Sequence, residues 1–77
     1  MSISNEDVSI LIKNEITDAD VTITGDGYKY EAVVISEEFE GLSTLKRHQL
    51  VYSTVNSAIT SGELHALTII AKTPAEV

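Results

Sequence analysis

Two short stretches of this sequence carry side chains that could do chemistry. One is the run Lys46-Arg47-His48, and the other is His65 within the segment Leu-His-Ala-Leu. An imidazole can bind a transition metal or exchange a proton near neutral pH, and the two cations can hold an acidic partner or a phosphate. Because the chain has no cysteine, any metal ligand must come from His, Asp or Glu.

The rest of the sequence contains no pattern typical of an enzyme active site. No nucleophile has a base at a useful spacing, and isolated carboxylates do not make a mechanism. The loop Gly25-Asp26-Gly27 has neither the further glycines and lysine of a phosphate loop nor acidic ligands at EF-hand spacing. The sequence therefore predicts a plain turn at this loop and a protein that is not an enzyme.

Size and charge restrict the class of protein. The 77 residues make one domain, 1–77, near the lower size at which a hydrophobic core is self-sufficient. Twelve acidic and five basic residues give a net charge of −7, which opposes binding to nucleic-acid phosphates. No apolar run is long enough to cross a membrane, and the first residues lack the basic and apolar regions of an export signal. We therefore expect a soluble cytoplasmic protein.

Capping residues and apolar spacing predict the first elements. Ser4 is the expected N-cap of a helix over residues 5–16, whose apolar residues recur at helical spacing. Alternating β-branched residues then predict strands over residues 21–24 and 28–36. The short loop 25–27 should join these two strands as a β-hairpin.

A loop and a long helical stretch follow the hairpin. Phe39 should plug the core, Gly41 should adopt a positive φ, and Ser43 should cap a helix that ends at Ser61-Gly62. Ser53, Thr54 and Ser57 are mediocre helix formers, so this stretch is either one helix or two shorter helices. The apolar stripe projected at about 100° per residue comprises Leu45, His48, Val51, Tyr52, Val55 and Ile59.

This projection separates the candidate site residues. His48 lies inside the stripe, so we expect its ring to be packed and hydrogen-bonded rather than open to a ligand. Lys46 and Arg47 fall off the stripe and should face solvent or a partner. Leu50 also lies far from the stripe, which makes it an exposed apolar residue or the mark of a bend.

The last strand is expected over residues 63–72. Its alternation puts His65, Leu67, Ile69 and Ala71 on the core side and Leu64, Ala66, Thr68 and Ile70 on the other side. His65 stands where this strand joins the sheet, so its ring can reach the rim. Pro74 should stop the strand soon after, because proline cannot donate to the hydrogen-bond ladder.

The predicted fold is α+β with the order α-β-β-α(-α)-β. A hairpin and a right-handed helical crossover give a mixed three-stranded sheet, with the third strand parallel to the second and the helices on one face. The other face is left uncovered. It should carry Tyr28, Tyr30, Ala32 and Val34, or their alternates, and could bind a partner.

Four short motifs, in this order, resemble the BolA family. They are Phe39-x-Gly41-x-Ser43, Arg47-His48-x-x-Val51-Tyr52, Leu64-His65-Ala66-Leu67 and Thr73-Pro74-Ala75-Glu76. The hairpin loop and the Thr-Pro-Ala-Glu ending look most like the IbaG-type branch. The resemblance runs from about residue 21 to the end, and it implies a class II KH-like fold, which agrees with the order of elements above.

The resemblance implies an adaptor function. BolA-like proteins pair with monothiol glutaredoxins of the Cys-Gly-Phe-Ser type, and the pair binds or transfers a bridging [2Fe-2S] cluster together with glutathione. Such a pair serves iron homeostasis and iron-sulfur client proteins. The family's ligand histidine corresponds to His65, and Arg47, Lys46 and Lys29 are the expected docking residues.

One position departs from the family pattern. Lys29 stands where IbaG-like relatives carry a histidine, and a protonated lysine cannot bind iron but can attract a glutathione carboxylate. We therefore expect a more labile cluster, a partner ligand in the missing position, or an apo complex only. The alternative function is a transcriptional regulator that binds DNA through the KH-like surface around Lys46-Arg47.

Overall fold

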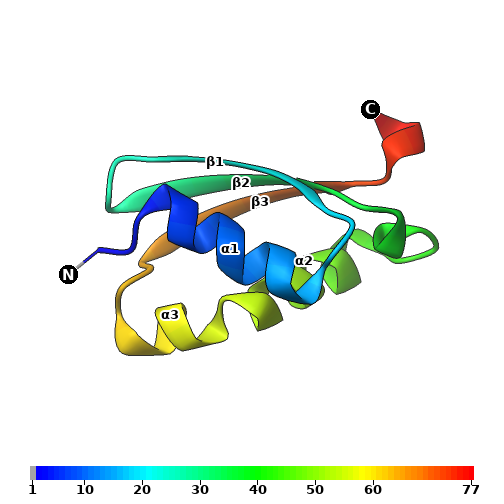
Figure 1. Ribbon diagram of the computed structural model, residues 1–77. Coiled ribbons are helices and arrows are strands. Elements are labelled where there is room, and N and C mark those ends of the chain that lie inside the picture. The colour runs from blue at the N-terminus through cyan, green and yellow to red at the C-terminus, as the bar shows by residue number, and fades with distance from the viewer. Residues whose placement is uncertain (1) are drawn as a thin grey trace.

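The computed structural model describes residues 2–77, which form a three-stranded sheet with three α-helices on one face (Figure 1). The elements are α1 (Asn5–Glu15), β1 (Asp20–Gly25), β2 (Lys29–Ile35), α2 (Thr44–Thr54), α3 (Asn56–Ser61) and β3 (Ala66–Lys72), with 3₁₀ turns at Glu37–Phe39 and Pro74–Glu76. β2 lies in the middle, antiparallel to β1 and parallel to β3. The predicted order, sheet and placement of the helices are confirmed.

Local signals set the helix ends as predicted. The Ser4 hydroxyl accepts a hydrogen bond from the Asp7 backbone N–H at 3.1 Å, and the Ser43 hydroxyl accepts one from the Lys46 N–H at 3.2 Å. Gly62 follows α3 with a φ of 84°, a left-handed conformation that favours glycine. Of the two alternatives for the second helical stretch, the helix pair is present, since Val55 separates α2 from α3.

The core lies between the sheet and the helices. Its fully or nearly fully buried apolar residues are Val8, Ile12, Ile16, Tyr30, Ala32, Val34, Phe39, Val51, Val55, Ala58, Leu64 and Ile69. Phe39 therefore plugs the core as predicted. Tyr30, Ala32 and Val34 belong to this inner face. Of the two sets expected for the uncovered face, the alternates, which include Val33 and Ile35, therefore lie there.

The predicted apolar stripe of the second helical stretch is partly wrong. Leu45 is 67% exposed, and Tyr52 and Ile59 are also exposed. The buried positions instead follow the spacing Val51, Thr54, Val55 and Ala58, with Leu50 packed against them. The projection chose the stripe by apolar residue type. The observed core face keeps helical spacing through the break at Val55 and is turned toward Leu50 and Thr54, two positions that the projection left off the stripe.

The start of the last strand also differs from the prediction. β3 begins at Ala66, so residues 63–65 form a connection and not part of the alternating strand. Leu64, expected on the outer side, is buried, and its N–H donates to the Ala58 carbonyl at 3.1 Å. His65 is exposed at the rim of the sheet, where its position in the chain had suggested it would lie.

Candidate metal-ligand site

His65 and Tyr28 form a stacked pair at one end of the sheet. Their ring centroids lie 5.4 Å apart with an angle of 24° between the ring planes. The pairing of β2 with β3 brings them together, since Lys29 is opposite Ala66 in the register and the Ala66 N–H donates to the Tyr28 carbonyl at 3.4 Å. The rim therefore presents an imidazole whose one face is covered by a phenol ring.

The hairpin turn that carries Tyr28 is held by Asp26. One oxygen of its carboxylate, Oδ1, accepts hydrogen bonds from the backbone N–H groups of Tyr28 and Lys29, both at 2.9 Å. These two bonds, the one from Lys29 first, hold the pKa of Asp26 below its ordinary value of 3.8. A Cβ on Gly25 would lie 2.7 Å from the Tyr30 ring, so this position requires glycine. The sequence-based prediction of a plain turn is confirmed.

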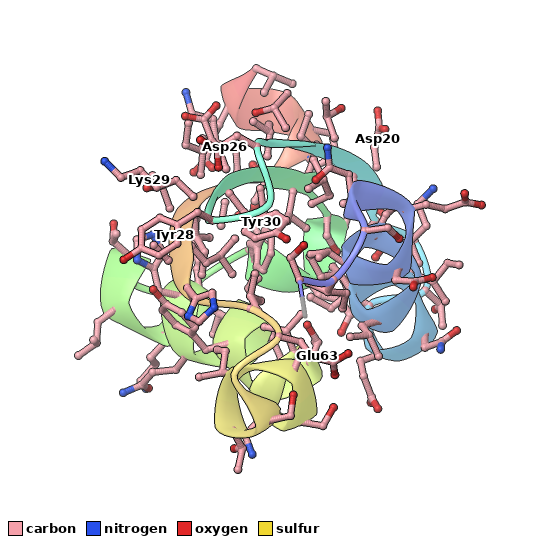
Figure 2. The ribbon with its side chains drawn as sticks, turned by 90° about the vertical axis from the view of Figure 1, so that its left-hand side faces the viewer. Asp20, Asp26, Tyr28, Lys29, Tyr30 and Glu63 are labelled. Atoms are coloured by element: carbon pink, nitrogen blue, oxygen red, sulfur yellow. The ribbon has the colours of Figure 1, made fainter. Side chains whose placement is uncertain are left out.

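The segment around Ile3, before α1, holds the backbone next to His65 in place. The Tyr30 hydroxyl donates to the Ile3 carbonyl at 2.5 Å, and the Ile3 N–H donates to the Glu63 carbonyl at 3.0 Å. Figure 2 shows Tyr30 turned toward this segment, whereas Tyr28 and Lys29 project outward from the turn. Residues 63–65 are thus tied to both α3 and the N-terminal segment, which fixes the backbone that presents His65.

Few side chains at this rim could bind a metal ion. Within residues 2–77, no three His, Cys, Asp or Glu side chains come together in a way that could hold a metal ion. Near His65 the chain contributes Tyr28 and Lys29, and the ammonium of Lys29 is not a ligand for iron. A neutral imidazole is a good ligand for iron, so His65 fits a cluster as one ligand of several. For a metal group held at His65, the further ligands would have to come from another molecule.

Arg47 does not face solvent, and that expectation is wrong. Its side chain is 14% exposed, and its guanidinium donates to the carbonyls of Leu42 and Ala71 at 3.0 and 3.2 Å. It also forms a bidentate pair with Glu76, with nitrogen-oxygen distances of 2.6 and 3.0 Å. Arg47 thus ties the start of α2 to the end of β3, and Glu76, in the Thr-Pro-Ala-Glu motif, is a partner that the sequence analysis missed.

The Arg47–Glu76 pair shifts both ionisations in the directions that stabilise the charges. Hydrogen bonds from the Arg47 guanidinium, with a further one from the Thr73 N–H, lower the pKa of Glu76 from 4.5 to about 2. The same contact with Glu76 raises the pKa of Arg47. The pair is therefore a structural clamp at the end of β3, formed beside Pro74, which ends the strand as predicted.

The remaining residues of the Lys46-Arg47-His48 run do not form one site. Lys46 is exposed, but Arg47 is occupied by Glu76. His48 is partly exposed, and its ring makes no hydrogen bond within residues 2–77, so the expectation of a packed, hydrogen-bonded ring is wrong. This run also lies at the opposite end of β3 from His65, roughly 20 Å away at about 3.3 Å per strand residue.

The other motif residues belong to the scaffold. Gly41 has a φ of 77°, as predicted, in the loop that leads to the Ser43 cap. The Tyr52 hydroxyl donates to the Leu67 carbonyl at 3.1 Å, which fastens α2 along β3. Tyr52 therefore acts at the sheet edge and not, as projected, in the core stripe.

Fold and site together define a small α+β domain that presents a single exposed histidine at the start of a parallel strand. Residues 6–76 match the family model described as BolA-like protein. The chain belongs to the BolA family. In the part of the chain that the structure describes, no helix is both long enough and apolar enough to span a membrane.

Three relatives illustrate this membership. The acid stress protein IbaG of Escherichia coli strain K12 is 32% identical over 72 residues, which cover 94% of this chain and 86% of that protein. A BolA homologue from Coxiella burnetii superposes with a TM-score of 0.86 at 36% identity, covering 96% of this chain and 95% of the other. The BolA domain of SufE1 from Arabidopsis thaliana gives 0.85 at 28% identity, with 100% and 99% covered.

Proposed function

We propose that this protein is a non-enzymatic adaptor that pairs with a monothiol glutaredoxin and shares a [2Fe-2S] cluster with it. His65 is the cluster ligand that this chain supplies. The glutaredoxin cysteine and its glutathione supply thiolates, and the pair acts in iron homeostasis or in delivery to iron-sulfur client proteins. The exposed imidazole of His65, which within residues 2–77 belongs to no group of three metal-binding side chains, is the observation that carries this proposal.

The absence of a complete ligand group around His65, within residues 2–77, favours a site shared with a partner over a site formed by this chain alone. A [2Fe-2S] cluster needs four protein or thiol ligands, and a single imidazole cannot hold it. An imidazole that is exposed and fixed at a rim can instead complete the coordination of a cluster that a partner presents. The Tyr28 ring leaves the other face and the edge of the imidazole accessible.

Lys29 has a supporting part in this proposal. Figure 2 shows Lys29 projecting outward from the hairpin, and the strand register places it opposite Ala66, the residue after His65. Its ammonium can attract the carboxylates of a bound glutathione. In this scheme the partner side fills the coordination position that a histidine at residue 29 would occupy. The cluster is held less firmly as a consequence. Lys46 lies at the opposite end of β3 from His65, so a partner that docks on Lys46 does so away from the proposed iron ligand.

The test is an anaerobic reconstitution with a monothiol glutaredoxin, iron, sulfide and glutathione. Replacing a thiolate by an imidazole alters the charge-transfer bands and raises the reduction potential of a [2Fe-2S] cluster. Adding this protein to the glutaredoxin cluster should therefore change its visible absorption and circular dichroism. His65→Ala should abolish the change, and His48→Ala, at the partly exposed histidine of α2, is the matched control.

Two results would overturn the proposal. One is the absence of any complex with the glutaredoxin in size-exclusion chromatography, with or without the cluster. The other is a His65→Ala variant whose spectrum with the glutaredoxin equals that of the unmodified protein. A DNA titration at low salt covers the alternative function, which has lost the free guanidinium of Arg47 as support.

A further inference from the structure

An open groove lies between α1 and α3, on the helix side of the molecule. It encloses about 740 Å³, and the residues Ile3, Ile10, Leu11 and Ala58 give it an apolar lining. Ile10 is 47% exposed, although it is a large apolar side chain on a helix whose polar face should meet water. We call this feature the α1–α3 groove.

The charged residues of the groove are all acidic. Its lining includes the carboxylates of Asp7 and Glu63 and contains no lysine or arginine. Within residues 2–77 neither carboxylate forms an ion pair, and the chain as a whole has a net charge of −7. An apolar floor beside carboxylates that no lysine or arginine of residues 2–77 pairs with is complementary to a segment that carries apolar side chains flanked by lysine or arginine.

The groove adjoins the candidate ligand site. Glu63 lies two residues before His65, and its carbonyl accepts the Ile3 N–H at 3.0 Å, so the groove wall and the His65 backbone are parts of one connected segment. The lining extends along α1 from Ser4 to Leu11, about 10 Å at roughly 1.5 Å per residue, which is about two turns of a helix laid beside it.

From this geometry we propose that the α1–α3 groove docks a cationic amphipathic helix of a partner protein. Apolar side chains at i and i+3 or i+4 would cover Ile10 and Leu11, and lysine or arginine would approach Asp7 and Glu63. This binding requires neither iron nor glutaredoxin. It goes beyond the cluster-sharing function and would hold a second protein close to the His65 rim.

The probe for this test is a dye-labelled synthetic helix of about 14 residues, made of leucine and lysine with leucine at helical spacing. Fluorescence anisotropy with the metal-free protein should show saturable binding. Ile10→Ser should weaken it by about tenfold or more, because an apolar anchor at a groove is removed. Ile70→Ser is the matched control, since Ile70 is 37% exposed on β3 and is not part of the groove lining.

Variants that remove charges test the electrostatic part of the docking proposal independently, and they change only exposed residues. The double variant Asp7→Asn with Glu63→Gln should weaken binding at low salt and reduce its salt dependence, whereas Asp20→Asn with Glu31→Gln on the sheet should leave both nearly unchanged. Circular dichroism of each variant confirms that it is folded. A scrambled peptide of equal charge, which cannot form an apolar face, should bind at least about tenfold more weakly.

Several outcomes would overturn the docking proposal. One is an equal loss of binding with Ile10→Ser and Ile70→Ser, and another is equal binding of the scrambled peptide. A third is a set of backbone amide chemical-shift changes, in an NMR titration with the peptide, centred outside the groove. The last is a dimer that Ile10→Ser dissociates, which would make a second copy the occupant. Because no cluster or glutaredoxin is present, a negative result here leaves the His65 experiment unaffected, and the reverse also holds.

Discussion

The ring of Tyr28 lies against the ring of His65, with centroids 5.4 Å apart and an angle of 24° between the planes. Tyr28 belongs to the hairpin turn and His65 to the connection between α3 and β3, so the parallel pairing of β2 with β3 is what brings the two rings together. A ring that is packed on one side has fewer orientations than a free exposed ring. Tyr28 is therefore a positioning residue for the proposed iron ligand.

Tyr28→Ala should make the cluster of the proposed glutaredoxin complex more labile. Stacked ring pairs contribute about 0.5–1.5 kcal/mol beyond their buried area, so the rate at which a chelator removes the cluster should rise by up to roughly tenfold. Tyr28→Phe keeps the ring and should preserve the rate, which separates stacking from any role of the hydroxyl. Equal rates for Tyr28→Ala and the unmodified protein, in a complex that His65→Ala disrupts, would contradict a positioning role.

The Arg47–Glu76 clamp predicts a loss of stability in acid. The folded-state pKa of Glu76 is about 2, below its ordinary value of 4.5, so its contribution to the free energy of unfolding is complete above about pH 4.5 and is lost as the pH falls toward 2. Urea denaturation across this range should show a shallower decline for Glu76→Gln than for the unmodified protein. Glu31→Gln, on the open face of the sheet, controls for the removal of one charge.

Local features of the fold were predictable because short-range chemistry determines them. Ser4 and Ser43 mark the helix starts, because their hydroxyls accept hydrogen bonds from nearby backbone N–H groups. In β2 the side chains alternate between the two faces of the sheet, which puts Val34 in the core and Val33 on the outer face. The core face of α2 was not predictable by counting apolar residues. Leu45 looks like a core residue from its type, yet it is exposed, and the packing of Leu50 and the burial of Thr54 define a different face.

The candidate site was predicted only in part, because its contacts join distant segments. The exposed position of His65 follows from where the last strand joins the sheet. Its stacking on Tyr28 depends on the β2–β3 register, and the capture of Arg47 by Glu76 joins residues 29 positions apart. Neither contact can be predicted from the spacing of residues within one helix or strand. The sequence therefore contained no sign that Glu76 pairs with Arg47, and Lys46 and Arg47 were wrongly expected to face a partner together.

Phe39→Ala and Leu45→Ala should have very different effects on stability. Phe39 is fully buried, so its truncation leaves a cavity and should lower the free energy of unfolding by about 3–5 kcal/mol. That loss is a large share of the roughly 5–15 kcal/mol of a typical domain. Leu45 is 67% exposed, and its truncation should cost less than about 0.5 kcal/mol. Comparable losses in urea denaturation would mean that α2 buries the face first projected from the sequence.

Asp26→Ala should loosen the turn that presents Tyr28. The Asp26 carboxylate accepts the N–H groups of Tyr28 and Lys29, and removing it leaves both without their acceptor. We expect several-fold faster amide hydrogen exchange at these two residues, with little change at Val34 in the middle of the sheet. Asp26→Asn keeps a side-chain carbonyl at this position and should restore most of the protection. If Asp26→Ala exchanges as slowly as the unmodified protein, the backbone alone holds the turn, and the rim that carries His65 does not depend on this carboxylate.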